Sequence, residues 1–239
     1  MTRLLASVQD AREAEAALAG GADIIDFKNT ADGALGALPP ETIASGMHCL
    51  SGRAMTSTTA DDWPLDPQLL LRAVQRIGAT GVSYVKLGLL AGSGLEGCIE
   101  ALASVAAQYR LVAVFFADRG VPLDALRNLR GAGFAGAMID TFDKDAGGLR
   151  RHLGEDTLRA FVFTARELGL MTGLAGSLRL EDIAALTTLE PDLLGFRGAL
   201  CEPAGRTTPL SAAKVRAVRA ALDQARLGRG VRLANPVIP

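Results

Sequence analysis

Short runs of apolar residues alternate along this chain with longer segments in which apolar positions recur at helical spacing. This alternation is typical of repeated strand-helix units that bury a parallel sheet. The runs of strand length lie at 3–8, 23–28, 53–58, 82–89, 111–117, 134–140, 170–174 and 192–197. The helical segments begin at 11–19 and after Pro39–Pro40, and continue at 67–77, 95–108, 123–130, 155–168, 180–186 and 209–225.

Eight such units in 239 residues match the usual size of one (β/α)8 TIM barrel. An open, doubly wound sheet is the alternative, but the first strand is not followed by the glycine-rich turn of dinucleotide-binding folds. We therefore predict an α/β protein with a single barrel domain over residues 1–239. The tail after Gly228, with Pro236 and Pro239, is expected to be a packed or frayed extension.

The charge balance narrows the class of partner. A formal net charge of -1 gives no bulk attraction to nucleic acid or to an anionic membrane. The apolar runs are too short for a membrane span, and the first one is too short for a signal peptide. We expect a cytoplasmic protein that binds a small molecule, with self-association left open.

Cysteine and histidine are scarce and scattered. Cys49, Cys98 and Cys201 show no C-x-x-C spacing, and neither His48 nor His152 lies beside a carboxylate or another histidine at ligand spacing. The sequence therefore predicts reduced thiols and neither a metal site nor a histidine-based triad.

Lysine is also scarce, and three of the four lysines occupy informative positions. Because side chains alternate along a strand, Asp26 and Lys28 point into the barrel from one strand and Lys86 from another. Asp140 ends a third strand, and Lys144 follows it by four residues. These are the second, fourth and sixth strands, which supply side chains to shared interior layers. We expect the five residues to converge.

Such a cluster suits carbonyl chemistry. A lysine becomes a nucleophile when burial or neighbouring cations lower its pKa, and it then forms a Schiff base with an aldehyde. Asp26 and Asp140 are candidates for proton transfer. The alternative is that the lysines extend out of the rim and the aspartates serve as caps or ion-pair partners, but three of four lysines at strand ends favour a catalytic role.

A phosphate site is predicted beside this cluster. Gly176 and Ser177 follow the seventh strand, and Arg197, Gly198 and Ala199 follow the eighth, where barrels often hold a substrate phosphate. The alternative is that the glycines only form tight turns.

Four segments together resemble a known family. They are 26–29 with 33–37, 84–89, 140–145 and 195–201, with the sequences DFKN, GALGA, YVKLGL, DTFDKD and GFRGALC. From Leu4 to about Leu222 the chain resembles the (5-formylfuran-3-yl)methyl phosphate synthases of methanofuran biosynthesis.

The resemblance implies a barrel-shaped lyase that needs no cofactor. It would condense two molecules of glyceraldehyde 3-phosphate to a furan aldehyde phosphate, with loss of phosphate and water. The matching motifs imply that Lys28 forms the Schiff base, while Asp26, Lys86, Asp140 and Lys144 assist proton transfer and position the substrate. Two other readings stay open: a class I aldolase of phosphosugar metabolism, and a barrel that binds a phosphometabolite without catalysis.

Overall fold

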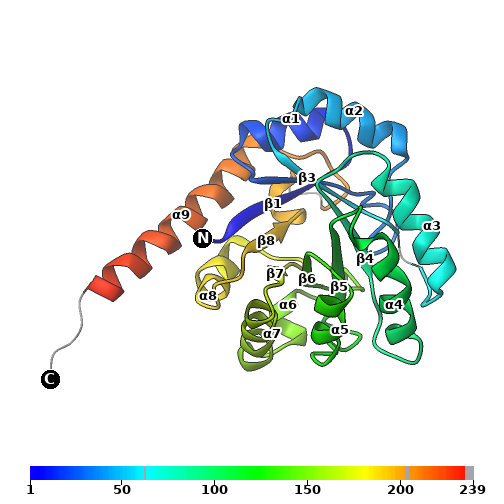
Figure 1. The fold of residues 1–239 in the computed structure, drawn as a ribbon. Coiled ribbons are helices and arrows are strands. Elements are labelled where there is room, and N and C mark those ends of the chain that lie inside the picture. Colours follow the sequence, from blue (N-terminus) through cyan, green and yellow to red (C-terminus); the bar gives the residue numbers. More distant parts are fainter. Residues whose placement is uncertain (62, 203–204, 235–239) are drawn as a thin grey trace, which may run out of the picture.

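Eight parallel strands close into a barrel in the computed structural model, which describes residues 1–61, 63–202 and 205–234 (Figure 1). Each strand pairs with its neighbours in sequence, and β1 pairs with β8 to close the ring. The predicted (β/α)8 fold is confirmed. The strands are β1 (Arg3–Val8), β2 (Ile24–Phe27), β3 (Met55–Thr59), β4 (Tyr84–Gly88), β5 (Leu111–Phe116), β6 (Gly136–Asp140), β7 (Met171–Leu174) and β8 (Leu193–Phe196).

Alternation along the strands divides the core into two parts, one inside the barrel and one between barrel and helices. Ile24 and Tyr84 belong to the inner cluster, whereas Ile25 and Val85, one position further on, belong to the outer cluster. The inward face of β2 and β4 is therefore the one predicted from the sequence, and it continues through Asp26 and Lys86 toward the mouth of the barrel.

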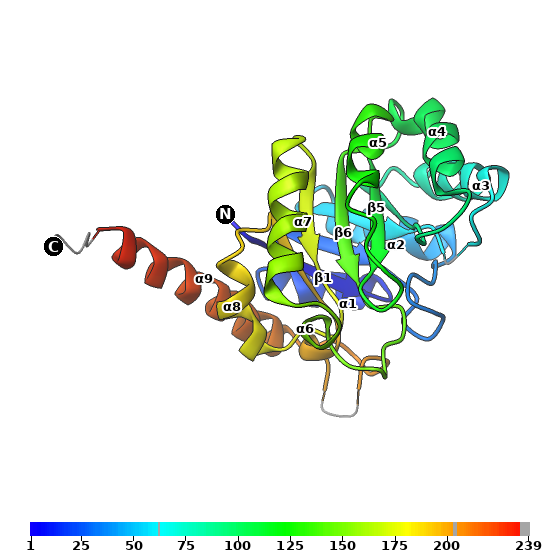
Figure 2. The ribbon, with the colours of Figure 1, turned by 90° about the horizontal axis from the view of Figure 1, so that it is seen from below.

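Helices surround the barrel on the outside (Figure 1, Figure 2). Asp66 caps the helix that begins at Pro67, because its carboxylate accepts hydrogen bonds from the backbone N–H groups of Gln68 and Leu69. The helices are α1 (Ala11–Ala19), α2 (Pro40–Leu50), α3 (Pro67–Gly78), α4 (Leu95–Ala106), α5 (Ala125–Gly131), α6 (Leu149–His152), α7 (Glu155–Glu167), α8 (Ile183–Thr187) and α9 (Ala212–Ala234), with 3₁₀ turns η1 (Leu180–Asp182) and η2 (Gly198–Leu200).

The last helix differs from the prediction at both ends. It begins at Ala212, because residues up to Leu210 are used in a bridge to Cys201, and it continues to Ala234. Gly228 therefore does not end the helix, and its last turns project beyond the barrel in both views (Figure 1, Figure 2). Pro236 and Pro239 lie outside the described residues. None of the described helices combines the length and apolar character needed to cross a lipid bilayer.

Close packing of α2 fixes the strand that carries the lysine predicted to be catalytic. Gly46 of α2 lies directly over the Phe27 ring, and a Cβ atom at this glycine would stand 2.2 Å from Cε1 of Phe27. Phe27 is fully buried, and in the sequence it lies between Asp26 and Lys28. The absence of a side chain at Gly46 thus allows the helix to hold β2 in place.

We expect Gly46→Ala to destabilise the protein by about 1–3 kcal/mol, because the added methyl group overpacks against Phe27. Gly97→Ala is the matched control, since Gly97 also lies in a helix but has open space around its Cα atom. That change should stabilise the protein by about 0.5–1 kcal/mol through helix propensity. Urea denaturation measures both, and equal effects of the two substitutions would contradict the packing argument.

Candidate active site

The five residues predicted to converge do lie together at the mouth of the barrel. The Lys86 ammonium is 2.8 Å from a carboxylate oxygen of Asp26. Asp140 lies between the other two lysines, with Lys144 Nζ at 2.7 Å from one of its oxygens and Lys28 Nζ at 3.5 Å from the other. Three lysines thus share two carboxylates.

Hydroxyl groups fix the Asp26 carboxylate from two further strands. Ser7 of β1 and Ser57 of β3 donate hydrogen bonds to its two oxygens, at 2.9 and 2.6 Å, and Lys86 donates a third. Asp26 is fully buried, and it does not line the cavity into which Lys28 opens. Sequence reasoning missed both serines, although a polar residue among the inward positions of a strand is the signal that would have found them.

Burial dominates the electrostatics of Lys28. Loss of solvent lowers the pKa of its ammonium to about 7; the charge of Asp140 opposes this shift, while those of Lys144 and Lys86 reinforce it. Burial alone would raise the pKa of Asp140, but Lys144 and Lys28 outweigh it and hold that pKa well below the usual range for a carboxyl. Near neutral pH the cavity therefore combines a lysine of which a substantial fraction is the neutral amine with an ionised carboxylate.

A second carboxylate holds the loop that carries Lys144. Asp118, which follows β5, accepts hydrogen bonds from the backbone N–H groups of Phe142 and Asp143 at 2.7 and 2.8 Å. Lys144 in turn donates to the carbonyl and the hydroxyl of Thr141 as well as to Asp140. The loop after β6 therefore presents Lys144 in a defined position.

The loops after β7 and β8 form one wall of the same cavity. Gly176 and Ser177 line the cavity from the loop after β7, and Gly198 and Ala199 line it from the loop after β8. None of the residues that the structure describes accepts a hydrogen bond from the backbone N–H groups of these four. A Cβ atom on Gly176 would lie 2.9 Å from Cγ2 of Thr141, so a glycine is required where the loop after β7 meets the loop after β6.

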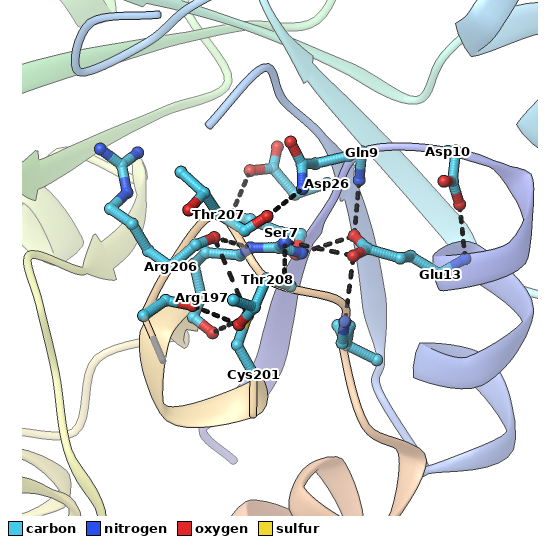
Figure 3. Close-up of polar contacts among 12 residues, drawn as sticks. Ser7, Gln9, Asp10, Glu13, Asp26, Arg197, Cys201, Arg206, Thr207 and Thr208 are labelled. Atoms are coloured by element: carbon cyan, nitrogen blue, oxygen red, sulfur yellow. Dashed lines mark hydrogen bonds and ion pairs between the residues drawn. The ribbon is translucent and has the colours of Figure 1, made fainter. Parts of the chain in front are cut away.

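Arg197 has a different environment from the one predicted (Figure 3). Its guanidinium forms a two-pronged ion pair with Glu13 of α1, at 2.5 and 3.1 Å, and donates to the carbonyls of Ser7, Arg206 and Thr208. All five N–H donors of an arginine are thereby used within the protein. The sequence suggested a phosphate ligand here, but the buried Glu13, on a distant helix, binds this side chain instead.

Among the described residues, no group of three or more histidine, cysteine, aspartate or glutamate side chains is arranged to hold a metal ion. Four members of the lysine-aspartate cluster line the cavity: Lys28, Lys86, Lys144 and Asp140.

Comparison with known proteins adds the family. A model of the 4-HFC-P synthase family matches residues 4–219. The chain belongs to this family. A (5-formylfuran-3-yl)methyl phosphate synthase of Methanococcus aeolicus is 36% identical over 83% of this chain and 89% of its own, and that of Methanopyrus kandleri is 38% identical over 85% and 91%. A Methylorubrum extorquens protein that carries the same name provisionally is 44% identical over 89% and 88%.

These names denote synthases of a phosphate compound, which places the chain among enzymes that act on phosphates. The matched range includes the whole lysine-aspartate cluster and both cavity-lining loops. The resemblance of the four sequence segments to this family is therefore confirmed over nearly the whole chain.

Solved structures support the fold alone. The phosphoribosyl anthranilate isomerase of Thermus thermophilus superposes with a TM-score of 0.65 over 93% of this chain and 99% of its own, at 20% identity. A thiamine phosphate pyrophosphorylase of Pyrococcus furiosus gives a TM-score of 0.63 over 94% and 96%, at 12% identity.

The Glu13–Arg197 pair should be much more important for stability than an exposed pair. Glu13→Gln leaves the buried Arg197 charge uncompensated, so we expect a loss of about 3–5 kcal/mol in the free energy of unfolding. Glu155→Gln removes the exposed partner of Arg159 and should change little. Urea denaturation tests both variants, and a Glu13→Gln protein as stable as the wild type would contradict this account.

Proposed function

We propose that this enzyme condenses two molecules of glyceraldehyde 3-phosphate to (5-formylfuran-3-yl)methyl phosphate, with loss of phosphate and water, for the biosynthesis of a methanofuran-type cofactor. The observation that supports this most is Lys28, a buried lysine with its pKa lowered to about 7 beside Asp140 in the cavity. Names of relatives supply the product, and the residues supply the chemistry.

Lys28 would begin the reaction as a nucleophile. Its neutral amine attacks the aldehyde carbon of one substrate molecule, and water leaves as the imine forms. The protonated imine then withdraws electrons from the neighbouring carbon, so loss of a proton there gives an enamine. This enamine carbon attacks the aldehyde of the second molecule, and the new carbon-carbon bond forms.

Asp140 and Lys144 would manage charge and protons around this nitrogen. The Asp140 carboxylate lies beside Lys28, so it is placed to stabilise the positive charge of the protonated imine. Lys144 shares the same carboxylate and lines the cavity, so it can donate a proton to a developing alkoxide or to a leaving phosphate. The strongly lowered pKa of Asp140 favours a role as charge partner over one as a strong base.

The Asp26–Lys86 pair would contact the substrate through Lys86. Lys86 lines the cavity, whereas Asp26 is fully buried behind it and is held by two serines. Asp26 therefore positions Lys86, and the Lys86 ammonium faces the substrate. This assignment gives Asp26 an indirect part in proton transfer, through the lysine that it holds.

Backbone N–H groups would bind a substrate phosphate. Gly176 and Ser177 after β7, and Gly198 and Ala199 after β8, line the cavity, and none of the described residues accepts a hydrogen bond from their N–H groups. Arg197 contributes to this wall by holding the loop rather than by contacting the phosphate. No cofactor enters this scheme, and the partner is a small phosphosugar.

Borohydride trapping with glyceraldehyde 3-phosphate tests the proposal directly. We expect a reduced adduct on Lys28, located by peptide mass spectrometry, and a furan aldehyde with free phosphate among the products. Lys28→Met should abolish the adduct, whereas Lys214→Met, which changes the remaining lysine outside the cluster, should retain it.

Other outcomes distinguish the alternatives. An adduct on Lys28 with only a simple aldol product would identify a class I aldolase. An adduct on Lys86 or Lys144 would overturn the assignment of the nucleophile. Binding of substrate by the folded protein with no adduct on any lysine would indicate a barrel that binds phosphometabolites without catalysis.

The pH dependence of adduct formation should follow the protonation of Lys28. Because its pKa is lowered to about 7, the initial rate of trapping should rise as the pH increases through about 7 and then level off. Asp140→Asn removes a charge that raises this pKa, so the profile should move to lower pH. Lys144→Met removes a charge that lowers it, so the profile should move to higher pH. Shifts of both variants in the same direction would contradict the electrostatic account.

A further inference from the structure

Arg206 is a cation in the cavity that the proposed chemistry does not use. It lies in the loop between η2 and α9, it is half-buried, and it lines the cavity together with Lys28, Lys144 and Asp140. Among the described residues its guanidinium has no hydrogen-bond or ion-pair partner, and in Figure 3 it points away from the Arg197–Glu13 pair.

The loop that carries Arg206 is nevertheless firmly held. Arg197 Nε donates to the carbonyl of Arg206 at 2.7 Å, and the same guanidinium donates to the carbonyl of Thr208. Glu13 accepts a hydrogen bond from the backbone N–H of Leu210 at 3.0 Å. The backbone on both sides of Thr207 is thus fixed to α1 and β8, while the Arg206 side chain is left for another partner.

Charge balance in the cavity indicates the kind of partner. Asp26 and Asp140 are shared by three lysines, and Glu13 compensates Arg197. The three buried carboxylates are thus already paired with the lysines and Arg197, and the Arg206 guanidinium adds a positive charge that none of them pairs with. Asp145 is the other carboxylate whose charge acts on Arg206, but it is exposed to solvent and makes no ion pair with it. An anionic ligand would compensate this surplus.

We propose that Arg206 binds a phosphate group of the substrate, opposite the N–H groups of Gly176, Ser177, Gly198 and Ala199. The inference rests on the proposed function for the identity of the substrate. A guanidinium matches the paired oxygens of a phosphate monoester, and a dianion fits the excess positive charge. Arg197 and Glu13 are positioning residues for this contact, because they hold the Arg206 backbone and do not touch the ligand.

This arrangement explains why two arginines near the eighth strand behave so differently. The buried Arg197–Glu13 ion pair fixes the backbone of the loop, and the Arg206 guanidinium keeps its donors for the ligand. The affinity for phosphorylated aldehydes is then higher than that for unphosphorylated ones, because an aldehyde without a phosphate makes no contact with Arg206.

The test uses Arg206→Gln, with Arg159→Gln as a matched control that removes an exposed arginine on α7. Within the part of the chain that the structure describes, the Arg206 guanidinium has no hydrogen-bond or ion-pair partner, so the variant should unfold at nearly the same urea concentration as the wild type. Binding of inorganic phosphate, measured by calorimetry, should weaken about tenfold to 100-fold in Arg206→Gln and stay unchanged in Arg159→Gln.

A second readout compares two aldehydes by borohydride trapping. With glyceraldehyde 3-phosphate, the concentration that gives half-maximal adduct should rise about tenfold to 100-fold in Arg206→Gln. With unphosphorylated glyceraldehyde, wild type and variant should behave alike. Arg206→Lys should recover part of the loss, because it restores the charge without the planar pair of donors.

The two proposals fail separately. Absence of any adduct in the wild type would overturn Schiff-base catalysis, while phosphate binding by calorimetry would still decide the role of Arg206. Unchanged phosphate affinity in a folded Arg206→Gln protein would overturn the phosphate contact. An equal loss of adduct with both aldehydes would do the same, because it would assign Arg206 to a general effect on Lys28.

Discussion

Three lysines, two of them buried and one partly buried, share two buried carboxylates and determine the character of this active site. Asp26 is saturated by Lys86 and two serines, and Asp140 is bound more closely by Lys144 than by Lys28. Lys28 is therefore the lysine with the weakest compensation, and burial lowers its pKa to about 7. An additional carboxylate would keep this amine charged, and one fewer would leave a second lysine uncompensated in a buried site. The shortage of negative charge leaves the burial of one amine uncompensated, and the proposed Schiff-base chemistry uses this property.

The geometry of the barrel brings these three lysines and two carboxylates together. Alternate strands contribute to the same interior layers, so β2, β4 and β6 bring their polar ends together while the outward residues pack under helices. That part of the site could be predicted from the sequence, because it depends only on the two-residue period of strands and on their order. The positions of Asp26, Lys28, Lys86 and Asp140 follow from those two rules, and Lys144 follows from its short separation from Asp140.

Contacts between distant segments could not be predicted in this way. Glu13 reaches Arg197 across 184 positions of sequence, and nothing in the period of α1 distinguishes this acid from one facing solvent. The same limit hid the proposed role of Arg206, because its loop has no regular spacing and the position of its backbone is set by hydrogen bonds from Arg197. The sequence predicts Arg197 as a phosphate ligand at a strand end, but its partner Glu13 lies on a helix that sequence position alone does not bring near. Side-chain pairing decides such cases, and pairing is a property of the folded chain.

Buried ion pairs often contribute little net stability compared with apolar residues of the same size, so a site that contains several of them requires another reason. Here the reason is position, because Ser7 joins the two ionic clusters: its hydroxyl donates to Asp26, and its carbonyl accepts a hydrogen bond from Arg197 (Figure 3). Ser7 on β1 therefore fixes both the lysine cluster and Arg197, which holds the loop of Arg206, to the same strand. In the proposed scheme, a phosphate bound by Arg206 and an aldehyde carbon at Lys28 lie at a fixed distance from each other, so only substrates with a matching distance between the two groups would use both.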